Sequence, residues 1–73
     1  MMWWKRKRLV RLHLVGDEPS IEGILVGRTD GHYRVEQASV IESAERSHAV
    51  EGWVLVPVAR VAFVQCLVAG RVA

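Results

Sequence analysis

The sequence predicts an all-β domain, a five-stranded small barrel that follows a basic N-terminal arm. Apolar and polar residues alternate over several short segments, β-branched residues are frequent within them, and turn-forming residues separate them. No stretch repeats its apolar residues with the 3.6-residue period of an amphipathic helix. A chain of 73 residues has room for one small domain, whose core alone stabilises the fold by about 3–5 kcal/mol.

The first strand is expected at residues 8–15, where three apolar side chains alternate with Arg11 and His13. This alternation predicts one buried face and one face exposed to water. The next five residues, 16–20, are rich in turn formers and are expected to end the strand.

The second strand is expected at residues 21–28 and contains Gly23 and Gly27. Neither glycine has a side chain to pack, so both predict a bulge or a sharp bend. Residues 29–31 contain the pair Asp-Gly, which is typical of a tight hairpin turn.

The third strand is expected at residues 32–41, where polar and apolar side chains again alternate. Tyr33 and Val35 share the face that we expect to be buried. The side chains expected on the opposite face are His32, Arg34 and Glu36.

The C-terminal half predicts a loop at 42–48, a fourth strand at 49–56, a break at 57–60 and a fifth strand at 61–68. The break follows from proline, which cannot donate a hydrogen bond to a strand ladder. Both strands are apolar on two faces, a pattern typical of strands buried between neighbours. We therefore expect another subunit or a partner protein to cover an edge of the sheet.

Charge divides the chain into an arm at 1–7, a barrel at 8–69 and a short tail at 70–73. Five of the ten basic residues lie near the start: Lys5, Arg6, Lys7, Arg8 and Arg11. The rest of the chain has a net charge of −3. Such an arm favours nucleic acid, an acidic protein surface or anionic lipid, although a solvated tail explains it equally well.

The arm also contains large apolar side chains close to the chain start. Tryptophan and arginine together are typical of protein interfaces. We therefore expect the arm to bind neighbouring subunits. The expected partner-binding residues are Trp3, Trp4, Lys5, Arg6, Lys7 and Arg8.

A second hypothesis is nucleic-acid binding through the arm together with His32 and Arg34. The basic residues would neutralise phosphates, and aromatic side chains would stack on bases. Acidic Glu36 shares the face of Arg34, which weakens this hypothesis.

No pattern in the chain indicates catalysis, a cofactor, a metal or a small-molecule substrate. Cys66 lies in an apolar strand and is expected to be a buried packing residue. The three histidines fall on separate predicted elements without metal-ligand spacing. The apolar stretch 53–69 is interrupted by polar residues and is shorter than the ~20 residues of a membrane span, so no membrane contact is expected.

Two stretches resemble the sequence motifs of Sm-like barrels, which share the SH3-like small-barrel pattern. The stretch IEGILVGRTDGHYRVEQASVIE places Gly23, Asp30, His32 and Val35 where that family has a strand-two glycine, a turn aspartate and an alternating third strand. The stretch EGWVLVPVARVAFVQ falls where the family has its last two strands. The resemblance covers roughly residues 8–68 and implies the fold.

The chain departs from the RNA-binding members of that family at two places. Arg34 stands where they have an asparagine, and Pro57-Val58 stands where they have Arg-Gly. Those family residues line the base pocket, so the resemblance implies the barrel more than it implies the RNA site.

The chain as a whole is similar to small proteins encoded among the virion structural genes of actinobacterial phages. The likeness lies in the basic start, WWKRKRLVRLHLVGDEPSIEGILVGR, the GHY triplet, an acidic loop and the ending VPVARVAFVQ. It implies a non-enzymatic head- or connector-associated component, such as a minor capsid or decoration protein. Its partners would be other virion proteins or copies of itself, and its location the virion, assembled in the host cytoplasm.

Overall fold

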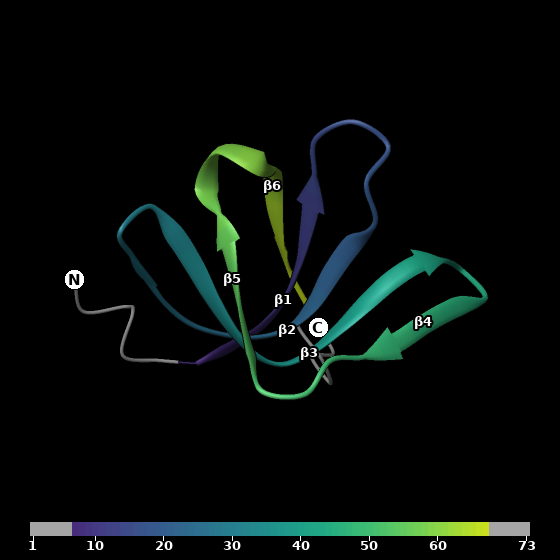
Figure 1. The fold of residues 1–73 in the computed structure, drawn as a ribbon, viewed down its shortest axis with the longest axis horizontal. Coiled ribbons are helices and arrows are strands. Elements are labelled where there is room, and N and C mark those ends of the chain that lie inside the picture. Colours follow the sequence, from purple (N-terminus) through teal and green to yellow (C-terminus); the bar gives the residue numbers. More distant parts are fainter. Residues whose placement is uncertain (1–6, 68–73) are drawn as a thin grey trace, which may run out of the picture.

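The computed structural model describes residues 7–67, which form a single antiparallel sheet of short strands and one turn of 3-10 helix (Figure 1). The elements are β1 (Arg8–Leu14), β2 (Ser20–Thr29), β3 (His32–Ser43), β4 (Arg46–Ala49), β5 (Trp53–Pro57), η2 (Val58–Arg60) and β6 (Val61–Cys66). The all-β class predicted from the alternating segments is confirmed.

The strands follow the order β4-β3-β2-β1-β6, and β5 also pairs with β3. The long strand β3 serves two partners, since its first half pairs with β5 and its second half with β4. Within the described residues β5 and β6 do not pair, so the sheet is curved but not closed into a barrel. The sequence predicted a five-stranded small barrel, whereas the described part of the chain has six strands in an open sheet.

The paired strands β2 and β3 bend near Gly23 and Gly27, as the two glycines predicted. The register between these strands shifts after Glu22 and again after Leu25. At Gly23 the two strands approach so closely that a Cβ would lie 2.7 Å from Val35 Cγ1 and 2.8 Å from the Glu36 carbonyl oxygen. Only glycine permits this approach, and the approach lets the sheet fold over its own inner face.

The turn between β2 and β3 is the tight hairpin that its Asp-Gly pair predicted. Asp30 has a φ of 50° and Gly31 a φ of 75°. Two consecutive residues with positive φ are typical of a type I′ turn, whose twist matches that of the flanking strands. The Gly31 carbonyl also accepts a hydrogen bond of 2.8 Å from the Val58 N–H, which ties the hairpin to η2.

The core lies on the inner face of the curved sheet and contains no buried polar or charged residue among those described. Its seven buried side chains are Val10, Leu12, Ile21, Leu25, Val35, Ala38 and Val56. The predicted inward faces of the first and third strands are thus confirmed, with Leu14 and Tyr33 half-buried against the same cluster. A core of this size supports only a marginally stable domain.

The segment after β3 differs from its prediction. The polar residues expected as a loop at 42–48 include β4, which returns along the end of β3 as an exposed hairpin strand. The chain then bends at 50–52, so the predicted fourth strand begins only at Trp53. Pairing with the long strand β3, rather than side-chain alternation, decides the course of this segment.

The last two strands are not buried between neighbours, which corrects the expectation drawn from their apolar sequences. Each pairs with one strand of the described chain, and Val56 is the single buried residue among them. Trp53, Leu55 and Phe63 are exposed.

The connection between β1 and β2 contacts η2 and holds it in place. The Val15 N–H donates to the Arg60 carbonyl at 2.9 Å, and the Arg60 guanidinium forms an ion pair with Glu18. These contacts fix the position of η2, which connects β5 to β6. Within residues 7–67 the structure contains no helix long and apolar enough to cross a membrane.

We predict that Gly23→Ala lowers the free energy of unfolding by about 1–3 kcal/mol, because the new methyl group clashes with the β3 backbone. Gly27→Ala is the matched control, since no atom lies within 4 Å of a Cβ placed there. Its effect is expected within about 0.5 kcal/mol. Urea denaturation followed by circular dichroism measures both variants, and equal stabilities would contradict the role given to Gly23.

Candidate interaction surface

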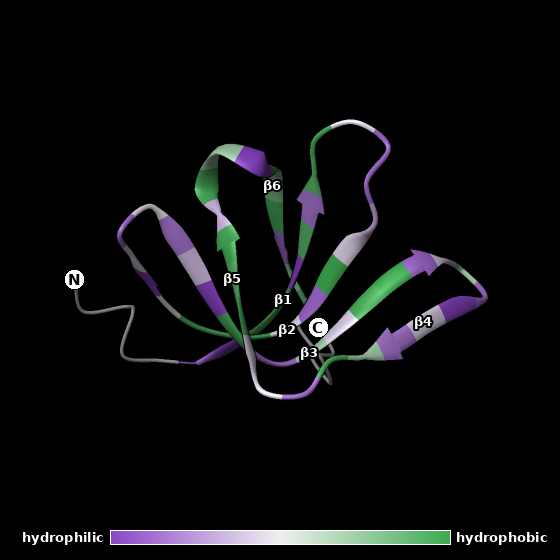
Figure 2. Ribbon diagram, viewed as in Figure 1, coloured by the Kyte–Doolittle hydropathy of each residue, from purple (hydrophilic) through white to green (hydrophobic). Residues whose placement is uncertain are grey.

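The edges of the sheet differ in how they are protected. The short strand β4 carries Arg46 and His48, both close to Glu42, so charged and polar groups guard that edge. The strands β5 and β6 contain no charged residue and at their outer edges pair with no strand among the described residues. Figure 2 shows this contrast, with hydrophilic colours along β4 and hydrophobic ones in β5 and β6.

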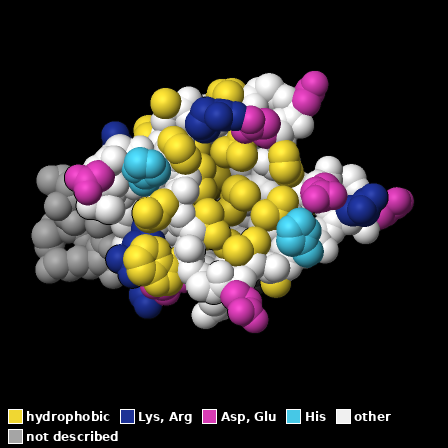
Figure 3. Space-filling model, viewed as in Figure 1, with side chains coloured by type: hydrophobic (Ala, Val, Ile, Leu, Met, Phe, Trp, Pro, Cys, Tyr) yellow, Lys and Arg dark blue, Asp and Glu magenta, His cyan; other side chains and the backbone are white. Residues whose placement is uncertain are grey.

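Exposed apolar side chains accompany the unprotected edges. Trp53 is 53% exposed, Leu55 48% and Phe63 59%. Trp53 and Leu55 share the outer face of β5, opposite Glu36 and Arg34 of β3. Figure 3 shows a broad cluster of apolar side chains on one face of the molecule, rimmed by charged residues and histidines. An exposed cluster of apolar side chains on a small domain, as in the middle of this view, is typical of a protein-binding face.

Phe63 is held in one orientation by a neighbour on β1. Its ring stacks on His13 with 4.3 Å between the ring centroids and 14° between the planes. His13 Nε2 lies 2.8 Å from Gln65 Oε1, so two residues on the same face of β6 position the imidazole. Because the Phe63 ring is already ordered, less conformational entropy is lost when a partner binds.

Arg34, one of the two expected nucleic-acid contacts, is already engaged. Its guanidinium carbon lies 3.7 Å from the centroid of the Trp53 ring, a cation–π arrangement. The Arg34 Nε is buried and has no hydrogen-bond partner. The sequence did not indicate this pairing, because it depends on the register between β3 and β5.

His32 lies on the same face of β3 as Arg34, as predicted, and is half-buried. Its Nδ1 is 2.9 Å from the Asp30 carbonyl oxygen, so the ring closes the hairpin turn. The structure therefore brings the two expected residues to one face, where each already makes a local contact within the chain.

The expected arm contacts are only partly within the described structure. Trp3, Trp4, Lys5 and Arg6 lie outside the described residues, as does the tail at 70–73. Lys7 and Arg8 are described and exposed, and Arg8 lines a hollow beneath β6.

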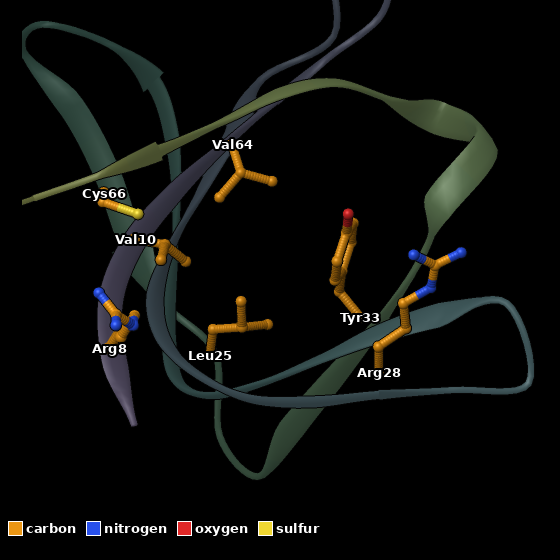
Figure 4. Close-up of a pocket in the computed structure, with 7 residues that line it drawn as sticks. All are labelled: Arg8, Val10, Leu25, Arg28, Tyr33, Val64 and Cys66. Atoms are coloured by element: carbon orange, nitrogen blue, oxygen red, sulfur yellow. The ribbon is translucent and has the colours of Figure 1, made fainter. Parts of the chain in front are cut away.

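This hollow has a volume of about 230 Å³ and opens at the inner face of the sheet (Figure 4). Its lining residues are Arg8, Val10, Leu25, Arg28, Tyr33, Val64 and Cys66. Leu25 and Val64 point into it from opposite walls, and the two arginines lie on opposite sides of it. The charged residues among this lining are both arginines, Arg8 and Arg28.

The hollow corrects one expectation and adds residues that sequence reasoning missed. Cys66, expected to be a buried packing residue, is exposed at the end of an edge strand. The sequence pattern assigned no role to Arg28. Its guanidinium carbon lies 5.9 Å from the centroid of the Tyr33 ring. The exposure follows from the missing closure between β5 and β6.

One further ion pair joins β1 and β2 on the described surface. Arg11 and Glu22 are joined by a 2.6 Å contact across β1 and β2, and both are partly exposed. Within residues 7–67 no group of three or more His, Cys, Asp or Glu side chains is arranged to hold a metal ion.

Comparison with known proteins finds no matching family model, no curated protein and no solved structure with significant similarity to this chain.

We predict that Arg34 and Trp53 are energetically coupled by about 0.5–1 kcal/mol, the usual strength of a cation–π pair at a partly exposed site. A double-mutant cycle of Arg34→Ala and Trp53→Ala, measured by urea denaturation, gives the coupling. The same cycle on Arg28 and Tyr33, separated by 5.9 Å, is the control and is expected to give a smaller value. Additive effects at Arg34 and Trp53 would contradict the prediction.

Proposed function

We propose that this protein is a non-enzymatic assembly module that binds neighbouring polypeptide chains along the outer edges of β5 and β6. One observation carries the proposal: both strands end the sheet, both lack charged residues, and together they expose Trp53, Leu55 and Phe63.

Unprotected strand edges are otherwise a hazard for a soluble protein. Each presents a row of backbone N–H and C=O groups that a further strand can pair with. Proteins that keep such edges free guard them with charge, as this chain does at β4. The absence of charged residues along β5 and β6 supports an edge that is normally covered, above all at β6, since Pro57 ends β5.

The small core supports the same conclusion on energetic grounds. Seven buried side chains stabilise a domain only weakly, and neither an internal disulfide nor a metal cluster is available among the described residues. A bound partner stabilises the folded state by mass action. Association would therefore pair the free strand edges and raise the free energy of unfolding.

We extend the proposal to the fold family. Without the β4 hairpin, β1, β2, β3, β5 and β6 follow the order of the five strands expected from the Sm-like and SH3-like resemblance. The close approach at Gly23 and the tight turn at Asp30-Gly31 fall at residues that carried this resemblance. These features support an open variant of the Sm-like barrel.

The partners are proposed from the resemblance to phage virion structural genes. A capsid or connector presents many copies of a few proteins, which suits a small module with two binding edges. In this role the protein is a minor head- or connector-associated component of the virion. Its basic arm, Trp3 to Arg8, would add contacts to neighbouring subunits.

Nucleic-acid binding remains the second proposal, supported by the Arg34–Trp53 pair on an exposed face. A guanidinium stacked on an indole forms a platform on which a base can also stack. The local contacts of His32 and the acidic Glu36 on the same face disfavour it relative to protein binding.

We predict that Phe63→Lys weakens association, because it places a charge on the edge strand β6. The measurement is light scattering over a concentration series, alone and after co-expression with the products of neighbouring genes. Val15→Lys is the matched control, since Val15 is also an exposed apolar residue, 41% exposed, but lies outside β5 and β6. A wild type that stays at 8.2 kDa in both conditions, or equal losses in both variants, would contradict the proposal.

The two proposals separate in a salt titration with a fluorescent single-stranded oligonucleotide. We predict no micromolar complex at physiological ionic strength, since the body of the protein is acidic and Arg34 is engaged. A complex that weakens steeply with added salt and is lost in Arg34→Ala would instead favour the nucleic-acid function.

A further inference from the structure

The hollow beneath β6 has the size and chemistry of a socket for a side chain. Its volume of about 230 Å³ lies below the range of about 300–1,000 Å³ that is typical of small-molecule sites. The floor is formed by aliphatic side chains, and Arg8 and Arg28 supply two positive charges at its sides. A large apolar side chain with acidic groups near it is complementary to such a site.

The free edge of β6 runs directly over this socket. The Leu67 N–H donates to the Leu9 carbonyl at 2.9 Å, so residue 67 directs its backbone groups toward β1. Backbone direction alternates along an antiparallel strand, which turns the N–H and C=O groups of Val64 and Cys66 outward to the free edge. The side chains of the same two residues line the hollow.

An extended segment added to this edge would therefore direct every second side chain to the inner face. Residues directly opposite each other on paired strands share a face, so a residue placed opposite Val64 or Cys66 points toward the hollow. Its neighbours two positions away lie about 7 Å to either side, on the same face. Figure 4 shows Arg28 and Arg8 on opposite sides of the hollow, with β6 running across it.

The terminal segments of the chain itself do not match the charge of this site. Residues 1–6 contain Lys5 and Arg6, and residues 68–73 contain Arg71, with no acidic residue in either segment. Like charges beside Arg8 and Arg28 oppose binding. Charge complementarity thus favours a segment from another protein.

We propose that the β6 edge and its socket bind an extended acidic segment of a partner protein, with the pattern acidic, any, large apolar, any, acidic. The apolar side chain occupies the hollow, the flanking carboxylates meet the two arginines, and backbone hydrogen bonds extend the sheet. This inference rests on the proposed assembly function and names the chemistry of its partner. Strand addition of this kind draws affinity from the backbone and specificity from the pocket.

The test uses the full chain and three synthetic peptides. The probe is acetyl-Ser-Glu-Thr-Leu-Thr-Glu-Ser-amide; one control replaces leucine with alanine and the other replaces both glutamates with lysine. Binding is followed by the amide resonances of Val64 and Cys66 and by the rate at which iodoacetamide alkylates Cys66, which is exposed in the free protein. At ten times its Kd the probe should slow alkylation about tenfold, since only the free fraction reacts.

The variant Arg28→Glu should weaken binding of the probe about tenfold by reversing one rim charge. Arg46→Glu makes the same charge change on the distant strand β4 and should leave the affinity unchanged. Thermal melts of both variants establish that they remain folded. Equal affinities for the three peptides, or equal effects of the two variants, would overturn the proposal.

Failure here is distinguishable from failure of the assembly function. If Phe63→Lys abolishes association while no peptide binds, the edges assemble but the acidic specificity is wrong. Concentration-dependent shifts of the Val64 and Cys66 amides without peptide, with a doubling of mass, would assign the edge to a second copy and overturn the inference. Protection of Cys66 by a single-stranded oligonucleotide in place of the acidic peptide would overturn it as well.

Discussion

The close approach of β2 and β3 at Gly23 determines how this sheet is curved. With no side chain at that position, β2 lies against Val35 and the backbone of Glu36, and the sheet folds over its own inner face. The fold encloses a seven-residue core without any helix to cover it. It also lets β3 extend past the bend and pair with both β4 and β5.

Curvature without closure explains why the surface has its particular chemistry. The bend brings β5 and β6 to the two ends of the strand order, joined by η2 but without pairing between them. The missing pairing leaves backbone groups of both strands free, while Trp53, Leu55 and Phe63 are exposed because they lie on the outer face of the sheet. The same gap opens the hollow between β6 and the β2–β3 hairpin, so the exposed edge and the socket have one structural origin.

Much of the fold was predictable because short-range patterns carried it. The alternation in β1 and β3, the bend at Gly23 and the Asp-Gly turn all follow from the chemistry of adjacent residues. The strand β4 and the exposure of β5 and β6 were not predictable in the same way. A polar segment becomes a strand where a long partner offers free backbone groups, and an apolar strand becomes exposed where no neighbour reaches it.

The all-β class, the inward faces of the first and third strands and the shared face of His32 and Arg34 follow from the residue pattern alone, because a period of two depends only on backbone geometry. The packing of distant strands is what stacks Arg34 on Trp53, gathers Arg8, Arg28 and Cys66 around one hollow and leaves β6 with a free edge among the described residues. These contacts join residues far apart in the chain, and register and curvature set their distances.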